Sequence, residues 1–293
     1  MLALGDLIVQ RGAPLPVGNA DPCEQIRWKD RATPLTISHV AADGTVSHRL
    51  RLGTDLVVDV LPDGKIIARH EAELPKASVD HFLADQVFPR LLAHDGAFVV
   101  HAGAVRVGSS AMMLMGVSGR GKSTLTASFD RSGFALLGDD AMVVSSLRDR
   151  PRIRAVYPSL RLFPDSIDAL MPGEPTAGPV AHFTSKERID VTIDSTIGNE
   201  PLPVAAIFTL ADAAADRVIA IRPLTAAETC MALVESSFAL DPSDTAQARR
   251  RLDDASALAR AVPAFEIAYP RDYARLPEVR QAILDQVAAL VPA

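Results

Sequence analysis

The segment that most constrains this chain runs from Gly116 to Ser123 and reads GVSGRGKS, which fits G-x-x-x-x-G-K-[ST] at every fixed position. The apolar stretch Ala111–Met115 runs directly into it, and a helical pattern begins at Lys122. A strand, a glycine-rich loop and a helix in this order predict a phosphate-binding loop in an α/β fold. The alternative, a glycine-rich turn before an ordinary helix, would make the lysine and the serine accidental.

The residue types of this loop match the chemistry of a bound nucleotide. Glycines permit backbone torsions that turn successive N–H groups inward, and the start of a helix adds a positive dipole end. We expect Lys122 to reach the β and γ phosphates of ATP, with GTP left open, and Ser123 to bind Mg²⁺. The expected nucleotide-binding residues are Gly116, Ser118, Gly119, Arg120, Gly121, Lys122, Ser123 and Thr124.

Composition is that of a folded soluble protein. The chain has 293 residues, enough for about two domains, and its 5% aromatic content indicates a core of Ala, Val, Leu and Ile, as in α/β sheets. Its net charge of −6 (30 basic against 36 acidic residues) predicts neither nucleic-acid nor membrane binding. Two cysteines, no basic leader and no long apolar run favour the cytoplasm.

The chain divides into three predicted regions. Residues 1–75 have the pattern of a small β-rich module, with strands at 55–60 and 65–69 joined by a tight turn at Leu61–Gly64. Residues 76–96 form a helical connector, in which Ser78 precedes the helical pattern, Gly96 ends it and Pro89 predicts a kink or a break. Residues 97–293 form the P-loop domain.

Strands and helices alternate in the P-loop domain. Strands are expected at 97–100, 104–107, 111–115, 134–137, 141–145, 153–157, 188–193, 204–210 and 217–221. Helices are expected at 122–131, 226–238, 244–260 and 277–290, with a capping box formed by Thr225 and Glu228 and with Pro277 in a first turn. The segment Pro164–Pro179, rich in Pro and Gly, is predicted to be a loop that covers a site or binds a partner.

Two acidic residues and one histidine are candidates for catalysis. Asp139 and Asp140 follow a buried-strand pattern, where carboxylates can bind Mg²⁺ or accept a hydroxyl proton. An Asp-Asp turn is the structural alternative. His101 ends another apolar stretch, and taken alone it is more often a hydrogen-bonded core residue than a catalyst.

In order, the segments VHAGAV (100–105), GVSGRGKS (116–123) and RSGFALLGDDA (131–141) resemble the catalytic core of HPr kinase/phosphorylase. They are most similar to the HPr-kinase-like proteins of bacterial biosynthetic clusters, including the serine kinases associated with lasso peptides. The resemblance implies an α/β P-loop core of the HPr-kinase/carboxykinase type. It also implies a homo-oligomer, since related enzymes form hexamers.

Residue roles follow from this resemblance. Lys122 would hold phosphate, Ser123 and Asp139 would serve the metal, Asp140 would accept the proton of the target serine, and His101 would lie beside it. The sequence also departs from the family, because Ser159 stands where the bifunctional enzymes carry a metal-binding glutamate. The resemblance therefore favours a kinase without the reverse reaction, acting on a peptide or small-molecule hydroxyl rather than on HPr.

Other charged groups have weaker claims. Arg161 is a candidate phosphate contact, and Lys186 and Arg188 are candidates for stabilising transition-state charge or binding an acidic acceptor, against the alternative of solvated strand residues. The run Arg249–Arg251 is expected to be a solvated helix face. His182 could gate the site, but it is expected to be an ordinary loop histidine.

These observations predict an Mg-ATP-dependent serine kinase. Three rivals stay open at this point: a nucleotide-gated binding module with slow ATPase activity, a kinase for free serine or another small hydroxyl compound, and a GTP-dependent carboxykinase-like decarboxylase. The last is disfavoured because the sequence offers no convincing second metal constellation.

Overall fold

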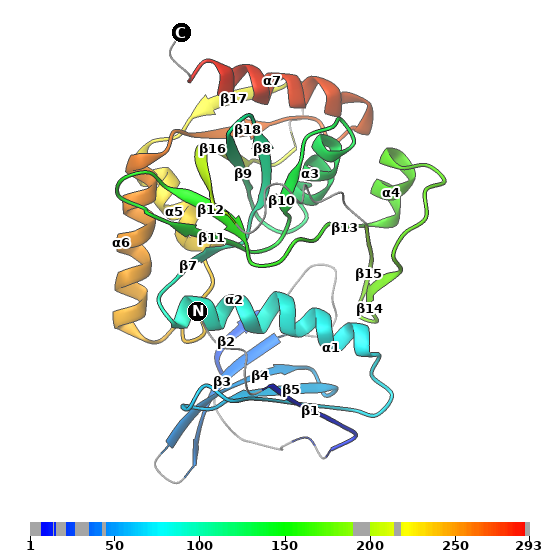
Figure 1. The fold of residues 1–293 in the computed structure, drawn as a ribbon, viewed down its shortest axis with the longest axis vertical. Coiled ribbons are helices and arrows are strands. Elements are labelled where there is room, and N and C mark those ends of the chain that lie inside the picture. Colours follow the sequence, from blue (N-terminus) through cyan, green and yellow to red (C-terminus); the bar gives the residue numbers. More distant parts are fainter. Residues whose placement is uncertain are drawn as a thin grey trace. The chain divides into compact units, whose positions relative to one another are not determined.

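The computed structural model describes residues 7–13, 15, 22–26, 35–42, 45–189, 200–213 and 218–290. The chain forms two compact units (Figure 1). Unit 1 comprises Met1–Gly96, Pro179–Ser185 and Ala239–Arg249, and unit 2 comprises Ala97–Gly178, Lys186–Phe238 and Arg250–Ala293. Two segments that follow the P-loop in the sequence thus belong to unit 1.

Unit 1 contains a sheet with the strand order β1-β6-β5-β4-β3-β2 among its described residues. Its strands are β1 (Leu7–Arg11), β2 (Pro22–Ile26), β3 (Leu35–Ala42), β4 (Thr45–Leu52), β5 (Leu56–Val60) and β6 (Ile66–His70), and the unit also holds β14 (Pro179–Ala181). The predicted turn is confirmed, because Leu61 and Lys65 close it between β5 and β6. Alternate residues of β3 and β4, such as Leu35 and Leu50, are buried in the core of the unit.

The predicted helical connector is continuous but irregular. It consists of α1 (Lys76–Phe82), a wide π-helical segment (Leu83–Val87) and α2 (Phe88–His94). Pro89 lies in the first turn of α2, where its missing N–H is tolerated, so the expected irregularity appears as a wide turn just before it. The expectation that Ser78 precedes the helix is wrong: Pro75 precedes it, and Ser78 is buried within α1.

Unit 2 contains a sheet with the order β10-β8-β9-β16-β12-β11-β7 in the described part of the chain, extended by β18 beside β16 and β17 beside β18. The strands are β7 (Phe98–Val100), β8 (Gly103–Val107), β9 (Ser110–Met115), β10 (Leu136–Gly138), β11 (Met142–Ser145), β12 (Arg152–Ala155), β16 (Leu202–Leu210), β17 (Ala220–Pro223) and β18 (Ala264–Ala268). Strands β9, β16 and β18 run parallel, so their carboxyl ends meet at one edge. A short β13 (Arg161–Leu162) pairs with β15 (Thr184–Arg188).

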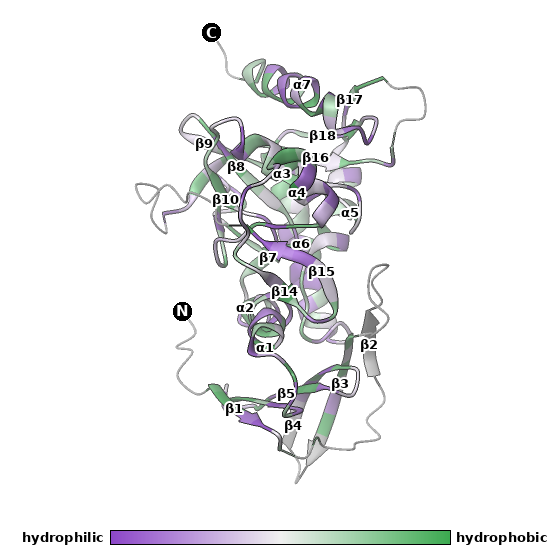
Figure 2. Ribbon diagram, turned by 90° about the vertical axis from the view of Figure 1, so that its right-hand side faces the viewer, coloured by the Kyte–Doolittle hydropathy of each residue, from purple (hydrophilic) through white to green (hydrophobic). Residues whose placement is uncertain are grey.

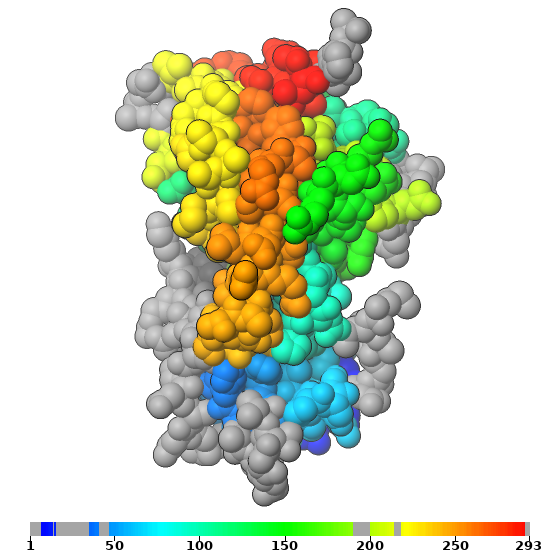
Figure 3. Space-filling view, turned by 90° about the vertical axis from the view of Figure 1, so that its left-hand side faces the viewer, coloured from blue at the N-terminus to red at the C-terminus, as the bar shows by residue number. Residues whose placement is uncertain are grey.

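Helices cover both faces of this sheet. On β9, Met112 and Leu114 join a core cluster with α3 (Lys122–Asp130) and α7 (Leu276–Ala288), while Met113 on the opposite face joins a cluster with α5 (Ala226–Ser236) and α6 (Thr245–Ala261). Figure 2 shows both hydrophilic and hydrophobic residues around α7, as expected of a helix with one buried face. Figure 3 shows α5 in yellow and α6 in orange side by side on one face of unit 2. Unit 2 is therefore a layered α/β structure, as predicted.

Several local predictions have clear outcomes. The capping box is confirmed, because Thr225 and Glu228 exchange both hydrogen bonds at the start of α5. The loop predicted at Pro164–Pro179 is wrong in its first half, which forms α4 (Pro164–Leu170). Residues 190–193 and 217 of two predicted strands lie outside the described residues. None of the helices within the described ranges is both long and apolar enough to cross a bilayer.

Candidate active site

The predicted phosphate-binding loop has the expected form. It connects the carboxyl end of β9 to α3, and Gly119 and Gly121 adopt φ values of 83° and 84°, which only glycine reaches without strain. Gly116 has a φ of 141°, and a Cβ there would lie 3.1 Å from the carbonyl oxygen of Leu210 on β16. All three glycines are therefore required by the path of the backbone, and the loop presents the start of α3 to a ligand.

Lys122 lies within the loop rather than in solvent. Its side chain is buried, and Nζ donates to the carbonyl oxygen of Gly116 at 2.6 Å. Burial lowers the pKa of Lys122 to about 8, although the nearby carboxylates of Asp139 and Asp140 act in the opposite direction. Burial takes hydration away from the ammonium group, and the negative charge of a bound phosphate would compensate for that loss.

Asp139 is a buried carboxylate at the end of β10. It is 1% exposed, and neither of its oxygens has a hydrogen-bond partner among the described residues. Burial, and then repulsion from Asp140, raise the pKa of Asp139 to about 7. The Ser123 hydroxyl lies near enough to oppose part of this shift but does not complete a hydrogen bond to either oxygen. A Cβ on Gly103 of β8 would lie 3.3 Å from Asp139 Oδ1, so the strand passes very close to this carboxylate.

These groups fit a bound Mg²⁺. The ion prefers oxygen ligands, and it is usually held by one or two carboxylates together with phosphate oxygens and water. An unpaired buried carboxylate is strongly unfavourable, and a cation would offset that energy. Asp139 and the neighbouring Ser123 hydroxyl would hold such an ion beside the phosphate-binding loop.

Asp140 is held by two neighbours. Its Oδ2 lies 3.2 Å from a guanidinium nitrogen of Arg161 and 3.4 Å from the Ser159 hydroxyl, which donates to it. Arg161 is buried and is also bonded to the Tyr157 hydroxyl at 3.2 Å. The arginine expected from the sequence to contact phosphate therefore orients the candidate proton acceptor in this structure.

His101 lies beside these residues because of the strand pairing. Met142, just after the acidic pair, is opposite Val100 in the β11–β7 ladder, which brings His101 next to the start of β11. Its backbone N–H donates to the Ser236 carbonyl at 2.7 Å, and its ring packs against Phe238. These two contacts hold the backbone and the ring of His101 in place.

The predicted residues converge on one cavity of about 320 Å³ in unit 2. Residues singled out from the sequence that line it are His101, Ser118, Gly119, Gly121, Lys122, Ser123, Thr124, Asp140, Arg161 and Lys186. Four predicted residues are not among its lining: Gly116, Arg120, Asp139 and Arg188. The side chain of Arg120 bonds instead to the Leu210 carbonyl and to Asp212, and Arg188 lies in β15 opposite Arg161.

Two further sequence candidates are not among the residues that line the cavity. His182 belongs to unit 1, where its Nδ1 lies 3.1 Å from the Ser78 hydroxyl. In the run 249–251, the first two arginines are exposed and the third is half-buried, which agrees with an exposed helix face.

Part of the cavity wall consists of residues that the sequence did not single out, although Asp165 and Ser166 lie in the segment Pro164–Pro179, which was predicted to cover a site or bind a partner. It comes from the end of β13, from the start of α4 and from the segment after β18, and its residues are Leu162, Phe163, Asp165, Ser166, Tyr269, Arg271, Asp272, Tyr273 and Leu276. The Tyr273 hydroxyl bonds both Asp165 and Ser166, at 2.9 and 3.1 Å. The guanidinium of Arg271 lies 4.0 Å from the centre of the Tyr269 ring. The available signal was the polar segment Tyr269–Tyr273 directly after an apolar strand, but its position required knowing that β18 runs parallel to β9.

Comparison with known proteins gives a distant structural likeness. No family model matches the sequence, and no curated protein matches it. Among solved structures, the chain is similar to the HPr(Ser) kinase/phosphatase from Coxiella burnetii, with 12% sequence identity and a TM-score of 0.34, over 65% of this chain and 97% of that chain. A likeness at this level does not establish a shared function.

Proposed function

We propose that unit 2 is an Mg-ATP-dependent kinase that transfers the γ-phosphoryl group to a serine hydroxyl of a peptide or protein in the cytoplasm. The observation that carries this proposal is one cavity lined by both the phosphate-binding loop and a separate carboxylate, Asp140, with His101 beside it. A loop that only bound a nucleotide would not need the second group. A phosphotransferase needs both, because the nucleophile must lose a proton as it attacks.

The division of roles follows from position and charge. The backbone N–H groups of the loop and Lys122 bind the phosphates, and Ser123 with Asp139 would hold Mg²⁺, which neutralises phosphate charge when bound. The serine oxygen forms a bond to the γ-phosphorus while the bond from that phosphorus to the bridging oxygen breaks, and ADP leaves. Asp140 accepts the serine proton.

Basic side chains in the cavity suit a reaction in which negative charge shifts. Arg161 and Lys186 both line it, and the charges of Lys186 and Arg120 also act on Lys122. Such fixed positive groups stabilise the charge on the transferring phosphoryl group without reorganisation. Arg161 has a second role, since its contact with Asp140 keeps that carboxylate facing the cavity.

A serine in a peptide is favoured over free serine by the resemblance to cluster-encoded kinases carried by segments 100–105, 116–123 and 131–141. The identity of the acceptor is the most specific part of the proposal. Its test must distinguish transfer of the phosphoryl group to a peptide, to a small molecule and to water.

The test is phosphoryl transfer from γ-labelled ATP, with GTP in parallel, to a library of serine-containing peptides and to free serine, read by mass spectrometry. We expect Lys122→Ala to abolish transfer through lost phosphate binding. Asp140→Asn should leave ATP binding nearly unchanged and reduce transfer by about 10²–10⁴-fold, the usual contribution of a positioned base. The matched control is Asp168→Asn, which removes an exposed carboxylate of α4 that does not line the cavity.

Three results would contradict the proposal. Wild-type turnover by Asp140→Asn would remove the assigned proton acceptor. Label found only as inorganic phosphate would indicate a nucleotide-hydrolysing module, and label found only on small hydroxyl compounds would indicate a metabolite kinase.

A further inference from the structure

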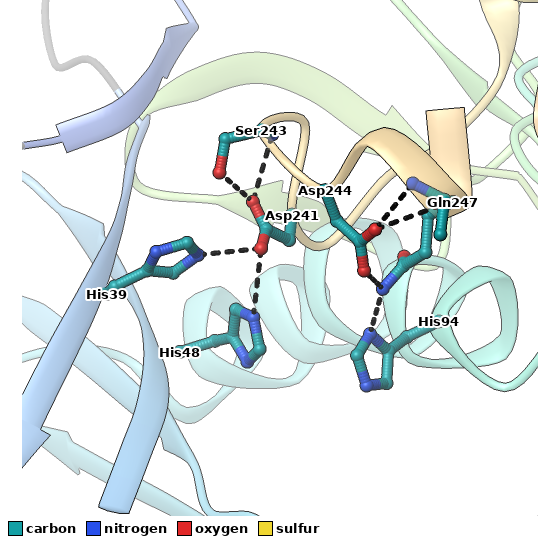
Figure 4. A network of polar contacts seen from close by, with 8 residues as sticks. His39, His48, His94, Asp241, Ser243, Asp244 and Gln247 are labelled. Carbon is teal, nitrogen blue, oxygen red and sulfur yellow. Dashed lines mark hydrogen bonds and ion pairs between the residues drawn. The ribbon is translucent and has the colours of Figure 1, made fainter. Parts of the chain in front are cut away.

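Unit 1 contains a cluster of two histidines and one aspartate that has no part in the reaction above. His39 of β3 and His48 of β4 are directly opposite each other in the antiparallel ladder, and Asp241 comes from the segment Ala239–Arg249 of the same unit (Figure 4). Each residue offers one ligand atom, and these three atoms all lie within 4.8 Å of one another.

The strand pattern explains why both imidazoles face inward. Successive side chains alternate between the faces of a strand, so His39 shares a face with the buried Leu35 and Ile37. By the same rule, His48 shares a face with Leu50 and Leu52, which are both buried. The two histidines thus continue the core-facing side of the hairpin where the apolar core ends.

Asp241 reaches this point because its neighbour is part of that core. Leu240 is fully buried in the core of unit 1, which fixes the backbone next to Asp241. One carboxylate oxygen, Oδ1, accepts from the backbone N–H of Ser243 at 2.9 Å and from its hydroxyl at 2.6 Å. The other oxygen, Oδ2, is left facing the histidines, as Figure 4 shows.

The distances are close to those of a metal site. Asp241 Oδ2 lies 2.9 Å from His39 Nε2 and 3.9 Å from His48 Nε2. Ligands about 2.0–2.2 Å from a tetrahedral Zn²⁺ are themselves about 3.3–3.6 Å apart, a range that falls between these two distances. Hydrogen bonding to Asp241 would account only for the position of His39, because 3.9 Å is too long for a hydrogen bond from His48 to Asp241.

We propose that His39, His48 and Asp241 bind a transition-metal ion of the Zn²⁺ class. Two imidazoles and one carboxylate are a donor set that suits such ions, and Mg²⁺ prefers oxygen ligands alone. Side-chain exposures of 16% for His48 and 14% for Asp241, against 36% for His39, leave an approach on the His39 side. The bound ion would tie the segment 239–249 to the β3–β4 hairpin.

A nearby histidine does not belong to the set. His94 packs against His48, with ring centres 5.4 Å apart, and its Nδ1 accepts from the side-chain amide of Gln247 at 3.0 Å. Gln247 is held in turn by Asp244. The hydrogen bond from Gln247 fixes the orientation of the His94 ring, which packs beside the cluster, and we assign His94 no metal contact.

The test uses the full-length protein, stripped with a chelator and titrated with Zn²⁺ against a chromophoric competitor. We expect one Zn²⁺ per chain and a higher unfolding temperature with the metal. The double variant His39→Gln/His48→Gln should lose the site. Ser243→Ala removes an outer partner of Asp241 and should weaken binding by roughly 10–100-fold. His182→Gln, also in unit 1 but outside the cluster, should bind like the wild type.

A measurement on the unmodified protein guards against variants that fail to fold. With Co²⁺ in place of Zn²⁺, the proposal expects the intense visible bands of a four- or five-coordinate site with nitrogen ligands. Weak octahedral bands, or equal Zn²⁺ binding by the double variant, would overturn it. Kinase activity plays no part in either readout, so this proposal and the proposed function fail independently.

Discussion

At the scale of single residues, the site is defined by charged groups held in places that disfavour their charge. Lys122 and Asp139 are both buried. Burial lowers the pKa of Lys122 and raises the pKa of Asp139, and in each case this favours the neutral form of the side chain. Such shifts are common where a ligand later restores the missing charge partner. A nucleotide would provide that partner for Lys122, and a divalent cation would provide it for Asp139.

This reasoning predicts how nucleotide affinity depends on pH. The pKa of Lys122 is lowered to about 8, so the free protein loses this proton as the pH rises through 8. A bound phosphate favours the charged ammonium form of Lys122. Above pH 8, where Lys122 is mostly neutral in the free protein, nucleotide binding is therefore accompanied by the uptake of a proton by Lys122. We expect the Kd for ADP to be nearly constant from pH 7 to 7.5 and then to rise by up to about tenfold per pH unit. Isothermal titration calorimetry measures it.

The matched control is Lys122→Met, which should bind weakly and with little dependence on pH in the same range. A wild-type Kd that stays constant up to pH 9.5 would show that Lys122 remains charged in the free protein, against the expectation from its burial.

The residue scale was also the most predictable from the sequence. The fixed positions of the GVSGRGKS segment each have a specific physical task, so the pattern predicted the loop, its lysine and its glycines without knowledge of the tertiary structure. Arg120 is different, because its position in the loop says nothing about its direction. The structure shows it bonded to Asp212, a partner 92 positions away.

At the scale of elements, strand β8 and helix α3 pack at a contact that tolerates only glycine. A Cβ on Gly103 would lie 2.4 Å from the Thr126 hydroxyl oxygen, which is buried and has no hydrogen-bond partner among the described residues. We expect Gly103→Ala to lower the free energy of unfolding by about 1–3 kcal/mol, as overpacked core positions do. Urea denaturation measures it.

A double-mutant cycle separates this clash from other effects of the alanine. Apart from the packing that the smaller side chain loses, Thr126→Ala alone should change the free energy of unfolding by less than about 1 kcal/mol. The double variant Gly103→Ala/Thr126→Ala should recover most of the stability that Gly103→Ala loses. If the double variant is as unstable as the sum of the singles, the clash with Thr126 is not the cause.

Elements were predicted well where a local signal was strong and poorly where neighbours decided. The capping box at Thr225 satisfies backbone groups within four residues, so the start of α5 could be predicted. The density of Pro and Gly in 164–179 favoured a loop, yet Pro164 sits in the first turn of α4, where its fixed φ suits a helix. Strand β18 is short and rich in Ala, and only its pairing with β16 identifies it.

At the scale of the whole molecule, the cavity depends on sheet topology. Parallel strands β9, β16 and β18 bring the phosphate-binding loop and the segment after residue 268 to one edge, although about 150 residues separate them. No local pattern carries that information, so Tyr269, Arg271 and Tyr273 could not be assigned to the site from the sequence. The return of segment 239–249 to unit 1, which supplies Asp241, was hidden for the same reason.

The division into two units predicts separate effects of the two proposed ligands on hydrogen exchange. All residues that line the cavity belong to unit 2, whereas His39, His48 and Asp241 belong to unit 1. Mg-ADP should therefore slow amide exchange in peptides that cover 116–126 and 269–276, and leave β3 and β4 unchanged. Zn²⁺, added without nucleotide, should slow exchange in 239–249 and in the β3–β4 hairpin, and leave the phosphate-binding loop unchanged.

Amide exchange followed by mass spectrometry reads both patterns in one experiment. Lys122→Ala should remove the first pattern and retain the second, and His39→Gln/His48→Gln should do the reverse. The physical reason is that a ligand protects amides whose opening would break its binding site. Protection of unit 1 by Mg-ADP alone would instead require that the nucleotide energetically couples the two units, since the described residues of unit 1 contribute nothing to the lining of the cavity.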